Sequence, residues 1–143
     1  MMLSESLKEI RFHVDKAAIG RYAAITQDFN PIHLDAEFAS KTSMGGIIAH
    51  GTMSMTLIWQ SLSESCKLDD DANVVLDIRF VRPVREGDWV VAGGTLVDAR
   101  GVYDVWVRAE APSRQELVIS GTATLGATGG ESNELSTGVE AGR

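Results

Sequence analysis

The chain has 143 residues, of which 44% are apolar and 23% are charged, the length and balance of a single soluble globular domain. A net charge of −7 argues against broad binding to nucleic acid or anionic lipid, because both need clustered positive charge. Cys66 is the only cysteine, which excludes an internal disulfide and a cysteine-rich metal site.

The ends of the sequence carry no recognisable targeting segment. No basic stretch followed by an apolar one opens the chain, and no run reaches the roughly 20 apolar residues of a membrane helix. We therefore expect a cytoplasmic protein with no membrane partner, and a single cysteine fits a reducing compartment. From Gly126 onward small and polar residues dominate, so we expect one domain over residues 1–125 and a disordered tail over residues 126–143.

Helices and loops are predicted for the first half of the chain. Asp15 is a suitable N-cap for a helix over residues 16–26. This helix cannot continue through the segment DFNPIHLD, because Pro31 forces the preceding residue out of the α region. A short helix capped by Asp35 is predicted over residues 36–42.

The segment from Gly51 to Cys66, GTMSMTLIWQSLSESC, predicts the main helix. Its apolar side chains cover more than one helical face, and no charge appears before Glu64. A helix that is apolar nearly all round is surrounded by protein, and this one is too short to span a bilayer. We expect a central, buried helix, with Cys66 as a core residue and not a nucleophile.

Alternating apolar and polar residues in the second half of the chain predict antiparallel strands. A further edge strand is expected over residues 8–14. The predicted fold class is α+β, with a long antiparallel sheet that curls over one buried helix. The three clearest alternating segments are residues 74–80, 103–111 and 117–125, and the three expected hairpin connections are residues 85–88, 99–101 and 112–115.

Common catalytic motifs are missing from the sequence. It contains no GxGxxG after a strand, no phosphate loop and no GxSxG elbow. The only histidines are His13, His33 and His50, and none is paired with another at the spacing of a helical zinc site. We expect no metal ion, and we expect His50 to pack or to anchor a loop.

The remaining candidate is the loop that contains Asp28, Asn30 and His33. A loop bent by proline can bring a carboxylate and an imidazole together around one water molecule, which is the arrangement needed for general acid–base catalysis. Asn30 can orient this pair or bond the loop's own backbone. The alternative is purely structural, because Asp, Asn and Pro are common in turns and His33 can be a packing residue.

Gly51 begins the predicted main helix. A glycine allows close approach to the backbone, and the free N–H groups of the first helical turn suit a carbonyl oxygen that gains negative charge. The alternative is a glycine that only caps or interrupts the helix.

Together, YAAITQDFNPIHLDAEFA and the later IIAHGTMSM resemble the hydratase motif of the MaoC-like, (R)-specific enoyl-CoA hydratase group of hot-dog proteins. The motif residues of this chain are Tyr22, Asp28, Asn30, Pro31, Ile32, His33 and Ala39. The stretch FVRPVREGDWV is similar to a strand-turn-strand segment common in these domains, so the resemblance covers about residues 8–125. Gln27 departs from the pattern, because many members have glycine before the aspartate.

The resemblance implies a hot-dog fold, a long central helix wrapped by a curled antiparallel sheet, and usually a homodimer. It implies a hydro-lyase that adds water to trans-2-enoyl-CoA and forms (R)-3-hydroxyacyl-CoA. Asp28 and His33 would activate the water, Asn30 would support them, and the Gly51 N–H would polarise the thioester carbonyl. The partner is an acyl-CoA thioester, and no cofactor is needed.

The CoA phosphates and the acyl chain need contacts that the motif does not identify. Arg79, Arg82 and Arg85 are candidates for the phosphates and equally plausible as solvent-facing charges. Trp59 can close the acyl pocket or fill the core, and we favour the core. The acyl group and the pathway stay open.

Two other functions stay open. A hot-dog thioesterase typically carries an acidic residue on the central helix, whereas residues 51–63 contain none. A non-catalytic acyl-CoA-binding subunit is the other alternative, although this chain keeps the reactive pair.

Overall fold

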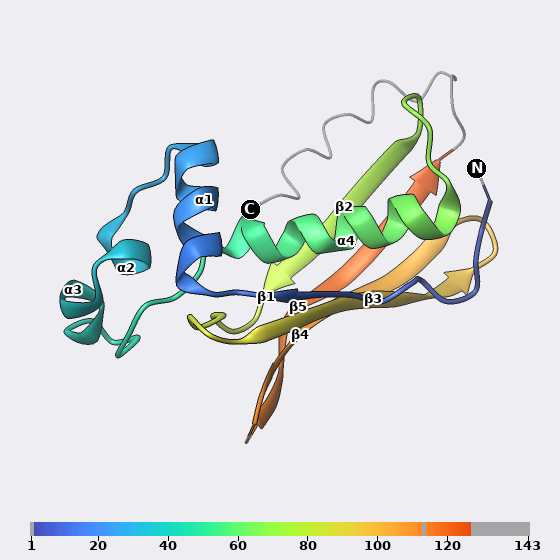
Figure 1. Ribbon diagram of the computed structural model, residues 1–143. Coiled ribbons are helices and arrows are strands. Elements are labelled where there is room, and N and C mark those ends of the chain that lie inside the picture. Colours follow the sequence, from blue (N-terminus) through green and yellow to red (C-terminus); the bar gives the residue numbers. More distant parts are fainter. Residues whose placement is uncertain (1, 113, 127–143) are drawn as a thin grey trace.

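The protein is described by a computed structural model that covers residues 2–112 and 114–126 (Figure 1). A long helix lies across one face of a five-stranded sheet, and three shorter helices lie together near the N-terminal end of that helix. The elements in chain order are β1 (Ile10–His13), α1 (Lys16–Thr26), α2 (Pro31–Leu34), α3 (Ala36–Ser40), α4 (Gly51–Cys66), β2 (Asn73–Phe80), β3 (Trp89–Asp98), β4 (Val102–Ala111) and β5 (Arg114–Gly126). Most of the expected tail, residues 127–143, lies outside the described residues.

All strand pairs are antiparallel, and the strand order is β1-β3-β4-β5-β2. The predicted connections at residues 99–101 and 112–115 are confirmed, since they join the neighbouring strands β3–β4 and β4–β5. The hairpin predicted at residues 85–88 is wrong, because β2 pairs with β5 at one edge while β3 pairs with β1 and β4. Turn residues mark where a strand ends but not which strand lies beside it.

The segment between β2 and β3 crosses from one side of the sheet to the other. At its start, Val81 donates a backbone hydrogen bond to the Val118 carbonyl of β5. At its end, the backbones of Gly87 and Asp88 bond both polar groups of Val14, which follows β1. The segment therefore passes beneath the N-terminal end of α4 and forms one wall of the site described below.

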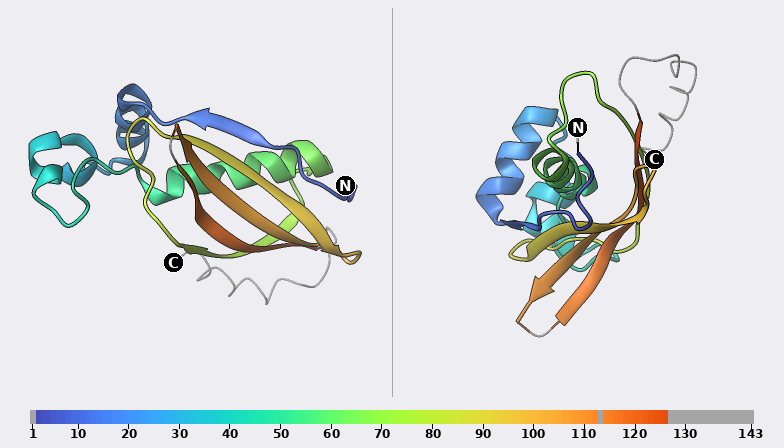
Figure 2. Two further views of the ribbon diagram at one scale, coloured as in Figure 1. Left: turned by 90° about the horizontal axis from the view of Figure 1, so that it is seen from below. Right: turned by 90° about the vertical axis from the view of Figure 1, so that its right-hand side faces the viewer.

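Helix α4 has the predicted bounds, but it is not buried all round. Leu57, Ile58 and Leu62 pack into the core against the sheet. The expectation that Trp59 fills the core is wrong, because the residue is 39% exposed. Figure 2 shows the reason: the sheet curves along one side of α4 and does not close around it. Cys66 is buried as predicted.

The helices that precede α4 also follow local signals. Helix α1 begins and ends as predicted, and the Asp15 carboxylate accepts a hydrogen bond from the Ala18 N–H at 2.8 Å. The helix capped by Asp35 is confirmed but ends at Ser40. The additional short helix α2 was not predicted, although Pro31 occupies its first position, where a missing N–H costs nothing.

A β-bulge shifts the register of β5. Val107 lies opposite Ile119, whereas the next residue, Arg108, lies opposite Leu117. Val118 is therefore the extra residue of the bulge, and its side chain is buried while Leu117 is exposed. Regular alternation over residues 117–125 would put Leu117 on the same face as Ile119 and Val118 on the other, so the predicted pattern is wrong at Leu117 and Val118.

Candidate functional site

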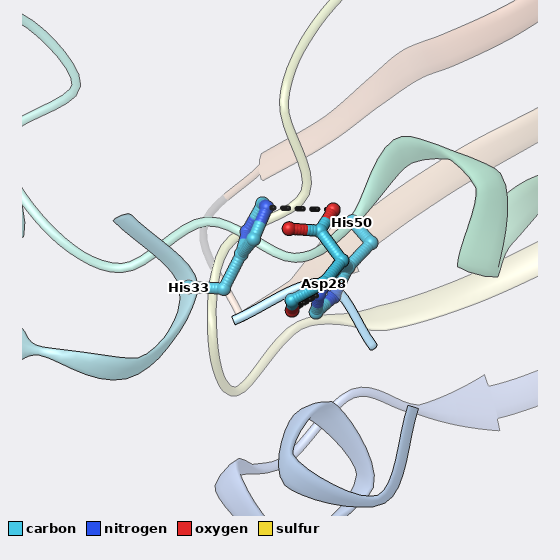
Figure 3. Close-up of side chains that lie close together, drawn as sticks. All are labelled: Asp28, His33 and His50. Carbon is cyan, nitrogen blue, oxygen red and sulfur yellow. Dashed lines mark hydrogen bonds and ion pairs between the residues drawn. The ribbon is translucent and has the colours of Figure 1, made fainter. Parts of the chain in front are cut away.

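The structure brings Asp28 and His33 together in front of the first turn of α4 (Figure 3). Asp28 follows the last turn of α1, where its N–H donates to the Ala23 carbonyl at 3.1 Å. His33 lies on α2, and its Nε2 atom is 4.0 Å from the Asp28 Oδ2 atom. The loop bent by proline therefore has the arrangement that the spacing predicts.

Asn30 shapes this loop through its own backbone. Its side-chain oxygen caps α2 by accepting from the Ile32 N–H at 3.1 Å, and its N–H lies 3.3 Å from the Asp28 Oδ1 atom. Of the two roles considered for Asn30, the structure supports the bonding of the loop. The contact of Asn30 with the reactive pair is made by its backbone N–H, which bonds the Asp28 carboxylate, whereas its side chain bonds the loop backbone.

The hydrogen bonds of His33 determine its tautomer. Its Nδ1 atom lies 2.7 Å from the Ile48 carbonyl oxygen, which can only accept. In the neutral ring, Nδ1 therefore carries the proton and Nε2 presents a lone pair toward the Asp28 carboxylate. The His33 side chain is 10% exposed and that of Asp28 is 51% exposed, so solvent reaches the pair from the Asp28 side.

Two acceptors that face each other across 4.0 Å leave a gap that suits a donor with two protons. A water molecule can lie about 2.8 Å from each atom and donate one proton to each. Its lone pairs then point away from the two acceptors, and both acceptors increase its nucleophilicity. Chemically, the pair can bind and deprotonate one water molecule.

His50 packs behind the pair as the N-cap residue of α4. Its ring is stacked on the His33 ring, with centroids 3.8 Å apart, and its Nε2 atom lies 3.0 Å from the Asp28 backbone oxygen. This agrees with the prediction that His50 packs or anchors a loop. Tyr22 contacts the His50 ring edge-on, and its hydroxyl lies 2.7 Å from the Thr52 hydroxyl.

Gly51 is exposed at the start of α4, and the helix has no side-chain cap. Among the described residues, the N–H groups of this first turn therefore receive no hydrogen bond from a capping side chain. The structure adds a reason for glycine that the sequence did not reveal. A Cβ atom at this position would lie 3.1 Å from the Phe80 ring of β2, tighter than ordinary packing.

Next to Gly51 lies a mostly apolar cavity of about 310 Å³, at the lower end of the usual range for ligand pockets. Ser54 is the polar exception on α4, and sequence reasoning did not single it out. Its hydroxyl is buried and has no hydrogen-bond partner in the described part of the chain. Other residues that line the cavity are Met44, Ile48, Phe80, Val84 and Ile119.

The three candidate arginines differ in their surroundings. Arg82 is exposed at the cavity and lies on the crossing segment. The Arg85 guanidinium donates to the Met44 carbonyl at 2.6 Å, a contact that holds the cavity wall. Arg79 is exposed on β2 and, by alternation, on the face opposite that of Leu76 and Ile78.

Asp28, His33 and His50 each place one possible ligand atom within 4.8 Å of the others. The geometry does not suit a shared metal ion, because the two imidazole planes are stacked at 25°. Lone pairs that lie in nearly parallel planes do not converge on one ion.

The helices of the described residues are all too short or too polar to span a bilayer.

Residues 3–115 match the family described as "MaoC like domain". The (R)-specific enoyl-CoA hydratase of Aeromonas caviae is 33% identical over 76 residues, which cover 53% of this chain and 57% of that protein.

Two further relatives have related names. The 3-hydroxybutyryl-CoA dehydratase of Methylorubrum extorquens is 35% identical over 88 residues, covering 62% of this chain and 54% of that protein. The chain thus spans little more than half the length of these first two relatives. The (R)-specific enoyl-CoA hydratase of Rhodospirillum rubrum is 30% identical over 115 residues, covering 78% of each chain.

Solved structures confirm the fold. An R-hydratase from Pseudomonas aeruginosa has a TM-score of 0.70 at 23% identity, covering 91% of this chain and 84% of that one. A protein from Archaeoglobus titled as a monoamine oxidase regulatory protein also has a TM-score of 0.70, at 26% identity, covering 91% and 93%. The predicted hot-dog fold is therefore confirmed, with an open sheet.

Proposed function

The chain belongs to the MaoC-like domain family, and on that premise we propose that it adds water reversibly to a trans-2-enoyl-CoA to give an (R)-3-hydroxyacyl-CoA. The observation that carries this proposal is the gap between His33 Nε2 and Asp28 Oδ2, which is 4.0 Å wide and bounded by two acceptors. The relatives named hydratase and dehydratase support a hydro-lyase.

In the proposed reaction, Asp28 takes a proton as the water oxygen bonds to C3 of the substrate. His33 holds the water through Nε2 and helps to return the proton to C2. One water molecule supplies both the hydroxyl and the proton, so addition occurs on a single face of the double bond. The thioester itself acidifies C2, so the reaction needs no cofactor or metal ion.

The start of α4 is proposed to stabilise the charge that develops on the thioester oxygen. The Gly51 N–H lies in an uncapped first turn, where the helix dipole adds to its effect. Loss of one such donor typically raises the barrier by about 3–4 kcal/mol. The adjacent cavity is proposed to hold the acyl group, and its volume of about 310 Å³ favours a short or compact one.

Binding of CoA and of a second subunit completes the proposal. Of the three arginines, Arg82 is the best placed for a CoA phosphate, because it lies at the cavity and Arg85 is engaged within the chain. The sheet ends in β2, whose outer edge is unpaired among the described strands. We propose a homodimer in the cytoplasm, and the mass in solution measured by light scattering tests the dimer.

The proposed function is tested by assaying purified protein with a panel of enoyl-CoA substrates and determining product stereochemistry. Asp28→Asn should lower turnover by about 100- to 10,000-fold while the circular dichroism spectrum stays that of the wild type. The matched control is Asp77→Asn, an exposed carboxylate on β2, which should keep full turnover.

Each alternative function has a distinct outcome in the same assay. Near-normal hydration by Asp28→Asn would refute the assignment of the base. Release of free thiol from saturated acyl-CoA would instead indicate a thioesterase. Substrate binding without hydration by the wild-type protein would indicate a non-catalytic acyl-CoA-binding subunit.

A further inference from the structure

His50 contacts each part of the proposed site. Its Nε2 atom lies 3.0 Å from the Asp28 backbone oxygen, its ring is stacked on His33, and it is joined to Gly51 by a peptide bond. We propose that His50 is a positioning residue that holds the acid, the imidazole and the start of α4 in one geometry. This inference rests on the proposed function for its kinetic consequences, but not for its structural ones.

The contacts of His50 assign its tautomer. A backbone oxygen only accepts, so the Nε2 atom of His50 carries a proton and donates it to Asp28. The Nδ1 atom is buried and has no hydrogen-bond partner. A proton on Nδ1 would find no acceptor among the described residues, so the geometry favours the Nε2–H tautomer of the neutral ring.

The tautomers of the two histidines are therefore opposite. His33 carries its proton on Nδ1 because of the Ile48 carbonyl, whereas His50 carries its proton on Nε2. The titratable side chains that face His50 are Tyr22 from α1, Asp28 from the loop and His33 from α2. With Nε2 engaged and Nδ1 enclosed, His50 has no route for passing a proton to the substrate.

Positioning by His50 has two separable parts, the hydrogen bond to Asp28 and the stack on His33. The stack limits rotation of the His33 ring, whose centroid is 3.8 Å away. The hydrogen bond ties the Asp28 backbone to the residue that caps α4. A displacement of about 1 Å in such an arrangement can cost about 100-fold in rate.

Two substitutions separate these parts. His50→Phe keeps an aromatic ring for the stack and removes the donor, whereas His50→Gln keeps a side-chain donor and removes the ring. We expect His50→Phe to lower kcat by about 10- to 100-fold and His50→Gln to lower it less, with KM within about threefold of the wild type in both. The matched control is His13→Phe, because His13 is stacked on Trp89 away from the site, and it should leave kcat unchanged.

The pH profile distinguishes positioning from proton transfer. Asp28 and His33 remain in both variants, so kcat/KM should keep both limbs of the wild-type profile. Loss of one limb in both variants would show that His50 itself transfers a proton and would overturn the proposal. Wild-type kcat in His50→Phe would also overturn it.

A spectroscopic test needs neither a variant nor a substrate. In nitrogen-15 NMR spectra of the wild-type protein near neutral pH, His50 should show the Nε2–H tautomer and the neutral fraction of His33 the Nδ1–H tautomer. The opposite tautomer, or a charged ring, at His50 would refute the inference even if hydration is observed. The predicted tautomers together with no hydration would refute the proposed function alone.

Discussion

Gln27 ends α1 in the left-handed region, at φ 61° and ψ 29°. A side chain with a Cβ atom is disfavoured there, which gives a physical reason for the glycine that the resemblance to the hydratase motif leads one to expect at this position. The Gln27 side chain offsets part of this strain by donating to the Ala24 carbonyl at 2.7 Å. Gln27, the residue before Asp28, therefore adopts a backbone conformation that costs free energy.

We predict that Gln27→Gly raises the free energy of unfolding by about 0.5–1 kcal/mol, because glycine adopts a positive φ without strain. Urea denaturation measures the change. The control is Gln27→Ala, which retains the Cβ atom and should give no increase. Equal stabilisation by both variants would contradict the assignment of backbone strain.

At the residue scale, local chemistry was predictable and long-range contacts were not. Asp28 and His33 are five positions apart, so a loop bent by the proline between them could bring them together, and the resemblance to the hydratase motif favoured this over a purely structural turn. Gly51 and Phe80 lie on different elements, so their close contact depends on how β2 crosses α4. The lone pair that His33 presents to Asp28 likewise depends on the distant Ile48 carbonyl.

Among the elements, α4 contains two buried serines in opposite situations. Ser61 donates a hydrogen bond to the Lys8 backbone oxygen, which ties the helix to the segment before β1. The Ser54 hydroxyl has no hydrogen-bond partner among residues 2–112 and 114–126. A buried polar group without a partner costs free energy that an apolar side chain of similar size avoids.

We predict that Ser61→Ala lowers the free energy of unfolding by about 1–2 kcal/mol, because it leaves the Lys8 carbonyl without its donor. Ser54→Ala should leave this free energy unchanged or raise it by up to about 1 kcal/mol. Guanidinium denaturation of the pair provides the comparison. A larger loss in Ser54→Ala than in Ser61→Ala would show that Ser54 has a partner of its own.

Element types were predictable because periodicity reports which faces are buried. The bounds of α1 and α4 follow from Asp15, Gly51 and the apolar pattern between the helix ends. The bulge at Val118 was not predictable from the sequence. Val118 and Ile119 are adjacent apolar residues that are both buried, and adjacent apolar residues also occur in regular strands that are buried on both faces. The exposure of Trp59 depends on how far the sheet curves around α4. The apolar pattern of a single helix gives no information about that curvature.

For the molecule as a whole, the buried side chain of Tyr103 connects the N-terminal segment to the sheet and to the C-terminal end of α4. Tyr103 of β4 is completely buried, and its hydroxyl donates to the Ser4 carbonyl at 2.6 Å and lies 3.4 Å from the Cys66 sulfur. Burial, and next the contact with Cys66, raise the pKa of the Tyr103 hydroxyl above its usual value of 10.0. The folded state therefore favours the protonated phenol.

Because this pKa is higher in the folded than in the unfolded chain, the stabilisation is fully present below pH 10 and is lost as pH rises further. We predict that Tyr103→Phe lowers the free energy of unfolding by about 1 kcal/mol near neutral pH. The difference between wild type and variant should shrink between pH 10 and 12. Urea denaturation at several pH values measures it, and a constant difference would contradict the account.

The strand order is the main property of the whole molecule that the sequence did not reveal. Turn residues between β2 and β3 resemble those of a hairpin, and only the hydrogen bonds of Val14 and Val118 show that the segment crosses the sheet. Local sequence patterns indicate the lengths of strands and the positions of turns. Neighbour relations depend on the free energy of the complete core, to which α4 and all five strands contribute.

Strand β5, the last strand of the described residues, is an interior strand, with β4 on one side and β2 on the other. During synthesis, β2 is made more than 30 residues before β5, its neighbour in the described sheet, so the backbone groups of β2 stay unpaired until β5 follows. Completion of this side of the sheet therefore requires β5. A truncation within β5 would remove an interior strand and detach β2, instead of trimming an edge.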